Sequence, residues 1–248
     1  MKLKSPAYIA QHIRRVLKDG GSAPHAEETQ RFFKEKVATR GWRTAELRKV
    51  AQRFRRVLLA EHGPDYLLAV ADQLFRGSII EEKAMAVELL AASAPHCGEA
   101  EFCLFESWLE RVGNWAEHDG LVHTLIGPMM LAYPPRAACT AAWANSSNLW
   151  MRRAAAVALI RGVRQGLFAA ETARVTSLLL DDQDLMVQKG LGWLLREAAK
   201  YQREAAVDLL LRIRFVAPRL VLRTACETLP PADRARLLNP ARAAAARG

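Results

Sequence analysis

Apolar residues recur every three to four positions along most of the chain, and this spacing predicts amphipathic helices throughout. Alternating β-branched runs joined by hairpin dipeptides, which would indicate strands, do not appear in the sequence. Glycine, proline and short polar pairs separate the apolar segments at close intervals. The pattern therefore predicts an all-α fold. The expected helices cover residues 6–19, 25–39, 44–59, 66–75, 79–92, 99–112, 115–131, 136–144, 150–163, 169–180, 185–201, 204–213 and 218–229.

These helices form pairs that repeat with a period of roughly 35 residues, the mark of stacked helical pairs. A basic residue recurs at one place of the period, with gaps of 35, 35, 35, 36 and 34 residues. Equivalent positions of a solenoid align along one face. We therefore predict an α-solenoid with a continuous basic stripe in its groove, one domain over residues 1–238, and a frayed tail at 239–248. The members of this basic column are Arg48, Lys83, His118, Arg153, Lys189 and Arg223.

The charge of the chain indicates a polyanionic partner. Its 36 Lys and Arg residues exceed its 26 Asp and Glu residues, which gives a net charge of +10. Such a balance favours nucleic acid first and an anionic membrane surface second. The four cysteines show no CxxC spacing, the N-terminus lacks the apolar core of a signal peptide, and no run of 18 apolar residues exists. We therefore expect reduced thiols, no membrane span, and a bacterial cytoplasmic setting.

Candidate chemistry gathers in the middle of the predicted array. Trp115 and Asp119 are four residues apart and share a helical face. Arg153 and Trp193 come from the next two column-bearing helices, with Trp193 four residues after Lys189. We expect these two indoles, the carboxylate and the guanidinium to converge on the concave surface.

A carboxylate in a basic groove repels phosphates, so its presence there indicates a chemical role. Asp119 could stabilise an oxocarbenium-like sugar or hold and deprotonate a water. Two aromatic walls could hold a deoxyribose and favour its cationic form, and Arg153 could bind a flanking phosphate. Glu117 lies two residues from Asp119 and would point elsewhere on the helix, so no second carboxylate is placed as a general acid.

Three segments resemble the bacterial HEAT-like-repeat DNA alkylation repair enzymes, which are DNA glycosylases. They are WAEHD (residues 115–119), NLWMRRAA (residues 148–155) and VQKGLGWLLREAAK (residues 187–200), and the similarity covers the chain from about residue 6 to residue 230. The resemblance implies a right-handed solenoid of helical pairs around duplex DNA. It also implies that Trp115 and Trp193 flank the sugar of the lesion, that Asp119 stabilises the sugar cation and positions water, and that Arg153 binds phosphate.

The resemblance further implies a substrate and additional DNA contacts. The family excises cationic N3- and N7-alkylpurines without flipping the base, and its open groove would accept bulky adducts; some relatives protect producers of alkylating antibiotics. A family tyrosine falls on Phe32, which keeps the ring and loses the hydroxyl. Thr44, at the opening of the third expected helix, is also a candidate DNA-binding residue. We expect a nucleoid-associated monomer that acts on duplex DNA containing alkylated purines and uses no cofactor.

Other chemistries have weaker support. Asp119 and His123 are four residues apart, but a third ligand at useful spacing is missing, so we expect no metal site. Gly-rich phosphate loops and nucleophile elbows do not appear. Two alternatives remain: a helical-repeat module that binds damaged or branched DNA without chemistry, and a scaffold whose basic groove binds acidic peptides.

Overall fold

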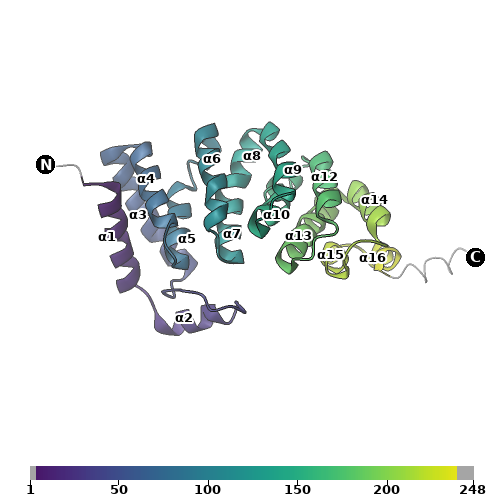
Figure 1. Cartoon of the computed structure of the whole chain (residues 1–248), viewed down its shortest axis with the longest axis horizontal. Helices are drawn as coiled ribbons and strands as arrows, with labels where there is room; N and C mark the ends of the chain where they lie inside the picture. The colour runs from purple at the N-terminus through teal and green to yellow at the C-terminus, as the bar shows by residue number, and fades with distance from the viewer. Residues whose placement is uncertain (1–3, 239–248) are drawn as a thin grey trace, which may run out of the picture. The chain divides into compact units, whose positions relative to one another are not determined.

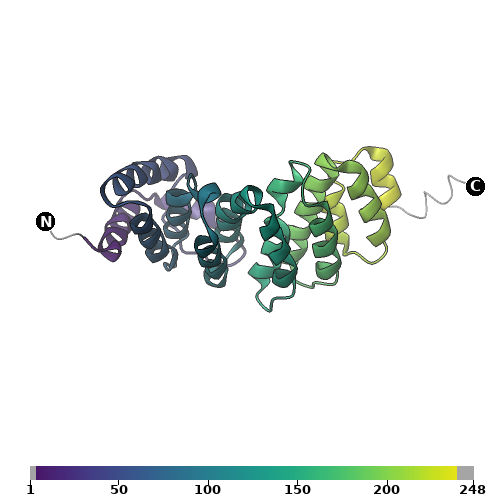
Figure 2. The same ribbon diagram turned by 90° about the horizontal axis from the view of Figure 1, so that it is seen from above.

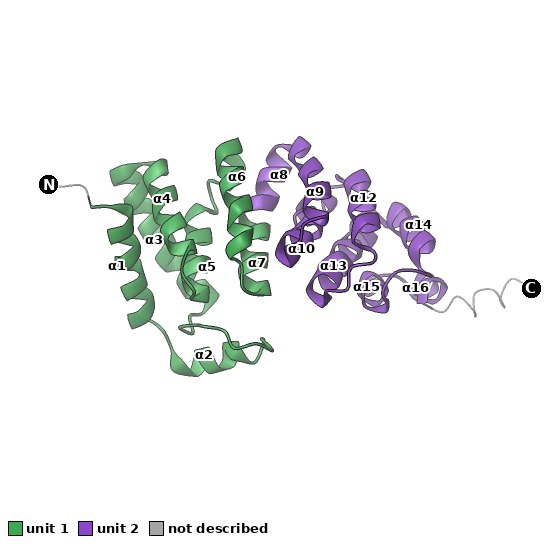
Figure 3. Ribbon diagram, in the orientation of Figure 1, with its two compact units in different colours: residues 1–125 green, residues 126–248 purple. Residues whose placement is uncertain are grey.

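A computed structural model describes residues 4–238, and this part of the chain forms helices and connecting turns with no β-strand. The prediction of an all-α fold is confirmed. Tertiary contacts divide the chain into two compact units, Met1–Leu125 and Ile126–Gly248, which are coloured separately in Figure 3. The expected tail at 239–248 lies outside the described residues, and the single domain over 1–238 stays a prediction.

In the N-terminal unit, successive helices pack side by side in both views (Figures 1 and 2). Helix α4 packs against α1 and α5, and α5 also packs against α3 and α7. The bounds are α1 Pro6–Asp19, α2 Ala23–Gln30, α3 Thr44–His62, α4 Pro64–Phe75, α5 Ile80–Leu90, α6 Glu99–Trp108 and α7 Trp115–Leu121. The short 3-10 turns of this unit cover Ala94–His96 and Leu109–Arg111.

The core of the N-terminal unit follows from the apolar spacing of its helices. Helix α1 begins where the Ser5 side chain accepts a hydrogen bond from the Tyr8 amide at 3.3 Å, and it buries Ile13 on its apolar face. The rings of Phe75 and Trp108 stack with centroids 4.3 Å apart, and both are fully buried. Each such large side chain contributes roughly 1.5–3 kcal/mol by leaving water.

In the C-terminal unit, α13 is the central helix and packs against α10, α14 and α15. Gly192 allows the close approach of α15, because a Cβ at this position would lie 2.8 Å from the Cβ of Thr224. The bounds are α8 Gly127–Ala132, α9 Thr140–Ala144, α10 Leu149–Val157, α11 Ile160–Val163, α12 Ala169–Leu179, α13 Leu185–Tyr201, α14 Arg203–Ile213, α15 Arg219–Ala225 and α16 Pro231–Leu238. A 3-10 turn at Pro134–Cys139 precedes α9.

The helix predicted at residues 25–39 is wrong in its second half. Helix α2 ends at Gln30, and residues 31–43 form a loop, called the Phe32 loop below. The Gln30 carboxamide causes this exit, because it donates to the carbonyl of Glu35 at 2.8 Å and accepts from the amide of Val37 at 3.0 Å. These backbone groups would otherwise serve a continuing helix.

Other elements also differ from the prediction. The expected helix at 115–131 changes to a π-helix at Val122–Ile126 before α8, where Pro128 lacks the N–H that would continue the α-helical ladder. The expected helix at 150–163 divides into α10 and α11. Helix α16 was not predicted, although a proline in its first turn and Asp233 are typical of a helix start.

Candidate functional site

The N-terminal end of α7 carries Trp115 and Asp119 and is fixed by its cap. The Asn114 side-chain oxygen accepts hydrogen bonds from the amides of Ala116 and Glu117, both at 3.1 Å. Asparagine at this position satisfies amides that have no partner within the helix. The cap places Trp115 in the first turn of α7, with Asp119 one turn later on the same face.

Lys83, a member of the basic column, supports this helix end from α5. Its Nζ lies 2.6 Å from Oε2 of Glu117 and also donates to the carbonyl of Arg111 at 2.6 Å. The same Glu117 oxygen accepts the Gly113 amide at 2.8 Å. The Lys83 and Glu117 side chains are only 7% and 3% exposed. Lys83 therefore holds the start of α7, and its predicted place on an open stripe is wrong.

His118, the next column member, is also inside the protein. Its side chain has no exposed surface, and its Nδ1 lies 2.7 Å from Oδ1 of Asp119. The Asp119 carboxylate oxygen is the acceptor in the tautomer that carries a proton on Nδ1. The Asp119 side chain keeps 22% of its surface exposed. The prediction that His118 contacts phosphate is therefore wrong. Its side chain instead forms a hydrogen bond that orients the partly accessible carboxylate of Asp119.

The aromatic partner of Trp115 is Phe33, which the sequence analysis did not select. Their ring centroids lie 5.2 Å apart with an interplanar angle of 21°, and Phe33 is 9% exposed. Phe32, onto which the family tyrosine was placed, is 72% exposed. The sequence pattern alone does not show which of these two adjacent phenylalanines stacks on Trp115. Stacking beside Asp119 therefore belongs to Phe33.

In the C-terminal unit, Arg153 on α10 is 5% exposed, and its Nη1 donates to the Met186 carbonyl in the first turn of α13 at 2.6 Å. A Cβ on Gly190 would lie 3.0 Å from Cγ of Arg153, so a glycine at this position leaves room for the arginine. Arg153 thus fixes α13 to α10. Its contact with phosphate stays a prediction.

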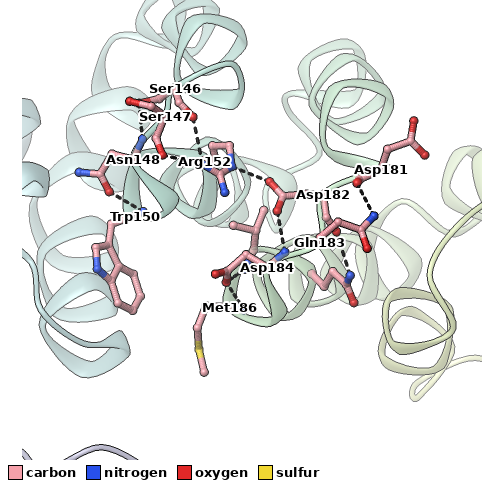
Figure 4. Close-up of polar contacts among 12 residues, drawn as sticks. Ser146, Ser147, Asn148, Trp150, Arg152, Asp181, Asp182, Gln183, Asp184 and Met186 are labelled. Atoms are coloured by element: carbon pink, nitrogen blue, oxygen red, sulfur yellow. Dashed lines mark hydrogen bonds and ion pairs between the residues drawn. The ribbon is translucent and has the colours of Figure 1, made fainter.

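The neighbouring arginine makes a second bridge between the same helix starts (Figure 4). Nε of Arg152 lies 2.6 Å from Oδ2 of Asp182, and its Nη1 donates to the carbonyls of Ser146 and Ser147. Asp184 then caps α13 by accepting the Met186 amide at 2.7 Å.

Trp193 is half-buried on α13, one turn before Glu197. Burial raises the pKa of the Glu197 carboxyl, but the hydrogen bond and charge of Arg164 and the charge of Arg196 together lower the pKa below its ordinary value. Arg164 Nε lies 2.8 Å from this carboxylate. Trp193 therefore lies one helical turn from an ionised carboxylate of the same helix.

The basic column is interrupted rather than continuous. Arg48, Lys189 and Arg223 are exposed, and Arg48 forms an ion pair with Glu88 at 2.8 Å. The other three members are buried. Exposed Thr44 is the first residue of α3. Contacts of these four exposed residues with DNA stay predictions.

The four predicted chemical residues are distributed over both units. Trp115 and Asp119 lie on α7 of the N-terminal unit, whereas Arg153 and Trp193 lie on α10 and α13 of the C-terminal unit. Their convergence stays a prediction. Within residues 4–238, no helix combines the length and apolar character needed to cross a bilayer. The same range holds no cluster of three or more His, Cys, Asp or Glu side chains suited to a metal ion.

Comparison with known proteins identifies the family. The family model described as DNA alkylation repair enzyme matches residues 13–229. A predicted DNA alkylation repair enzyme from Enterococcus faecalis has a TM-score of 0.77 at 15% identity, over 85% of this chain and 97% of that chain. The crystal structure of smu.31 from Streptococcus mutans UA159 has a TM-score of 0.56 at 18% identity, over 75% and 99% of the two chains. No curated protein matches the chain. The structural likenesses show an α-helical repeat fold, and the family match over most of the sequence shows that this chain belongs to the DNA alkylation repair enzyme family.

Proposed function

We propose that the protein is a DNA glycosylase that hydrolyses the bond between deoxyribose and cationic N3- or N7-alkylpurines in duplex DNA, without base flipping. Family membership supports DNA as the substrate. The observation that carries the proposal is the setting of Asp119: a partly exposed carboxylate, oriented by a buried histidine, on the helix face that also bears a stacked tryptophan. Bulky adducts at the same purine nitrogens belong to the proposed substrate class.

The chemistry requires little from the protein because the leaving group is already charged. When the C1′–N bond breaks, its electron pair passes to the purine and cancels the positive charge. The sugar becomes an oxocarbenium-like cation, which the Asp119 carboxylate stabilises. Water then bonds to C1′ and releases a proton through Asp119 to solvent, which leaves an abasic site.

The surrounding residues have separate roles in the proposal. Trp115, supported by Phe33, offers an aromatic face to the cationic sugar, and Trp193 contributes the second aromatic face that the family resemblance implies. His118 is a positioning residue, since its hydrogen bond to Oδ1 fixes the orientation of the Asp119 carboxylate. Lys83 and Glu117 act one step further away by fixing the start of α7.

Asp119→Asn tests the proposal directly. We expect release of 7-methylguanine and 3-methyladenine from methylated duplex to fall about tenfold or more, because the amide cannot stabilise a cation as a carboxylate does. Duplex affinity should hold or rise, since a negative charge near phosphates is removed. Release is measured by chromatography of freed bases and affinity by fluorescence anisotropy. If the unmodified protein binds duplex and releases no base, it is a binding module; if it also fails to bind, it is a scaffold.

A further inference from the structure

We propose that Glu81 of α5 is a positioning residue for the ring of Trp115. It acts through the Phe32 loop, whose residue Phe33 stacks on that ring. This inference rests on the proposed function, because it gives Glu81 a part in the reaction attributed there to Asp119 and Trp115. It adds a second support to the cap of α7 and requires no contact between the loop and DNA. Three observations carry it.

The first observation is that the contacts at the start of α7 fix its backbone and not the Trp115 ring. The cap by Asn114 holds two amides of the first turn, and Lys83 holds the Glu117 carboxylate. Both contacts set where the helix begins. Neither restrains χ1 and χ2 of Trp115, so the ring needs a contact of its own to keep one rotamer. Phe33 provides that contact, with ring centroids 5.2 Å apart and an interplanar angle of 21°.

The second observation is that the first turn of α5 binds the far end of the Phe32 loop, at residues 38–42. The Ile80 amide donates to the carbonyl of Ala38 at 3.0 Å. Glu81 is only 4% exposed, and its carboxylate accepts four more hydrogen bonds from the loop. The donors are the Thr39 hydroxyl at 2.6 Å and the amides of Arg40, Gly41 and Trp42 at 2.9, 2.8 and 3.2 Å. The loop is therefore fixed to α5 over several consecutive residues.

The side chain at position 81 must be a carboxylate to accept all four of these bonds. Oε1 accepts the hydroxyl and two of the amides, and Oε2 accepts the Arg40 amide. Donors of this kind are what make a buried carboxylate tolerable. Glutamine keeps one acceptor oxygen and replaces the other with a donor, so Glu81→Gln leaves at least one amide of the loop without its partner.

Further hydrogen bonds continue from this anchored end back to Phe33. The carboxamide of Gln30 bonds to the carbonyl of Glu35 and the amide of Val37, at 2.8 and 3.0 Å. The amide of Phe33 donates to the carbonyl of Gln30 at 3.1 Å. The Phe33 side chain is itself 9% exposed and packed on Trp115. A loop that is released from α5 therefore displaces Phe33 and leaves the Trp115 ring without its support.

The third observation is that Glu81 belongs to a run of three buried charged residues with separate partners. Glu81, Glu82 and Lys83 are 4, 9 and 6% exposed. Successive residues of a helix point about 100° apart, so the three side chains reach different segments. Oε2 of Glu82 lies 2.8 Å from Nε of Arg14 on α1. Glu81 thus holds the ring of Trp115 and Lys83 its helix start, whereas Glu82 holds α1.

The experiment follows the indole N–H signal of Trp115 by nitrogen-15 NMR of the full chain, assigned by its loss in Trp115→Phe. Phe33→Leu should shift this signal, because the neighbouring ring is removed. We expect Glu81→Gln to shift it in the same direction. The same variant should lower the rate of base release at saturating duplex about tenfold and change duplex affinity less than about threefold, because the fault lies in orientation rather than binding. Thr39→Val removes one donor and keeps the carboxylate, so it should give a smaller shift of the same sign.

Glu82→Gln is the matched control, since it alters a neighbouring buried carboxylate of the same helical turn that bonds to α1. It should lower thermal stability and leave both the Trp115 signal and the saturated rate unchanged. The inference is overturned if Glu82→Gln moves the signal as far as Glu81→Gln does, or if Glu81→Gln leaves signal and rate unchanged. The signal does not depend on catalysis, so a protein in which Glu81→Gln moves it but no base is released would support the positioning of Trp115 and contradict the glycosylase.

Discussion

The starts of α7 and α13 are both held by cations from the preceding repeat, but by different means. At α7 a single lysine, Lys83, meets the Glu117 carboxylate in a pair that is almost sealed from water. At α13 two adjacent arginines each make one of the contacts, since Arg153 binds a backbone carbonyl and Arg152 binds Asp182. We therefore expect that loss of Lys83 releases the start of α7 completely. Loss of one arginine should leave the start of α13 held by the other.

Lys83→Met should show the largest effect, because it leaves the Glu117 charge buried without its cation. We expect the free energy of unfolding to fall by about 3–5 kcal/mol. Urea denaturation followed by circular dichroism measures it. The double substitution Lys83→Met with Glu117→Leu should recover most of the loss, since no charge is then stranded. A single-variant loss below about 1 kcal/mol would contradict a sealed pair.

Arg152→Ala should cost less, about 1–3 kcal/mol, measured in the same way. The smaller loss follows because Asp182 still accepts the Asp184 amide at 2.9 Å and Arg153 still binds Met186. A loss equal to that of Lys83→Met would show that the two arginines do not hold the helix start independently.

His118→Leu should lower the rate of base release about tenfold at saturating duplex, which corresponds to about 1.4 kcal/mol. His118→Asn should restore much of the rate, because the asparagine amide can donate from near the position of Nδ1. Lys189→Leu, at the exposed column position of α13, should weaken duplex binding and leave the saturated rate unchanged. If both His118 variants lose the same amount of base-release rate and keep their stability, His118 does not act by positioning Asp119.

Glycine substitutions compare the two helices at a finer scale. A Cβ on Gly120 of α7 would meet nothing within 4 Å, so Gly120→Ala should stabilise the free protein by up to about 1 kcal/mol through helix propensity. Gly190→Ala should bring no such gain, because its Cβ would press on Arg153. Thermal melting distinguishes the two. A similar gain in both would show that Arg153 moves aside without cost.

Lowering the pH should reduce the stability of the C-terminal unit, because Glu197 becomes protonated and loses its ion pairs. Its pKa in the folded protein lies below the ordinary value, so its stabilising contribution is complete above that ordinary value and is lost as the pH falls toward the lowered pKa. Arg164→Gln removes the chief partner and should reduce this pH dependence. Denaturation midpoints across the acid range provide the measurement. Asp72, in the N-terminal unit, should respond less to loss of Arg111, because Arg76 and Trp108 also lower its pKa.

The period and the apolar spacing were sufficient to predict the all-α fold, because both report directly on helices that bury one face. They could not predict which way a column side chain points. Lys83 and Lys189 are the same residue type at equivalent places, yet one is buried and the other exposed. The difference depends on Glu117, one period ahead of Lys83. Spacing alone could not have identified the buried members, because Glu82 lies 34 residues after Arg48, which is nevertheless exposed.

The prediction for the site was correct in placing Trp115 and Asp119 on one helix. It did not include the side chains that contact them, Phe33 and His118. Phe33 reaches Trp115 because the chain leaves the helix at Gln30, and helical spacing alone could not show such an exit. The sequence also did not predict the hydrogen bond between His118 and Asp119. Residues next to each other in a helix normally diverge, so a bond between adjacent side chains depends on the rotamers that the surrounding core permits.

The ion pairs between neighbouring repeats have a consequence for how such a chain can evolve. Their partners are separated by about one repeat, as in Lys83–Glu117, Arg152–Asp182 and Arg164–Glu197, at 34, 30 and 33 residues. Deletion of a whole repeat would not preserve these pairs, because the residue one period after Glu117 is Arg152, which would place a second cation opposite Lys83. Each pair is therefore specific to its own junction between repeats, and a mutation that removes one partner favours loss of the other.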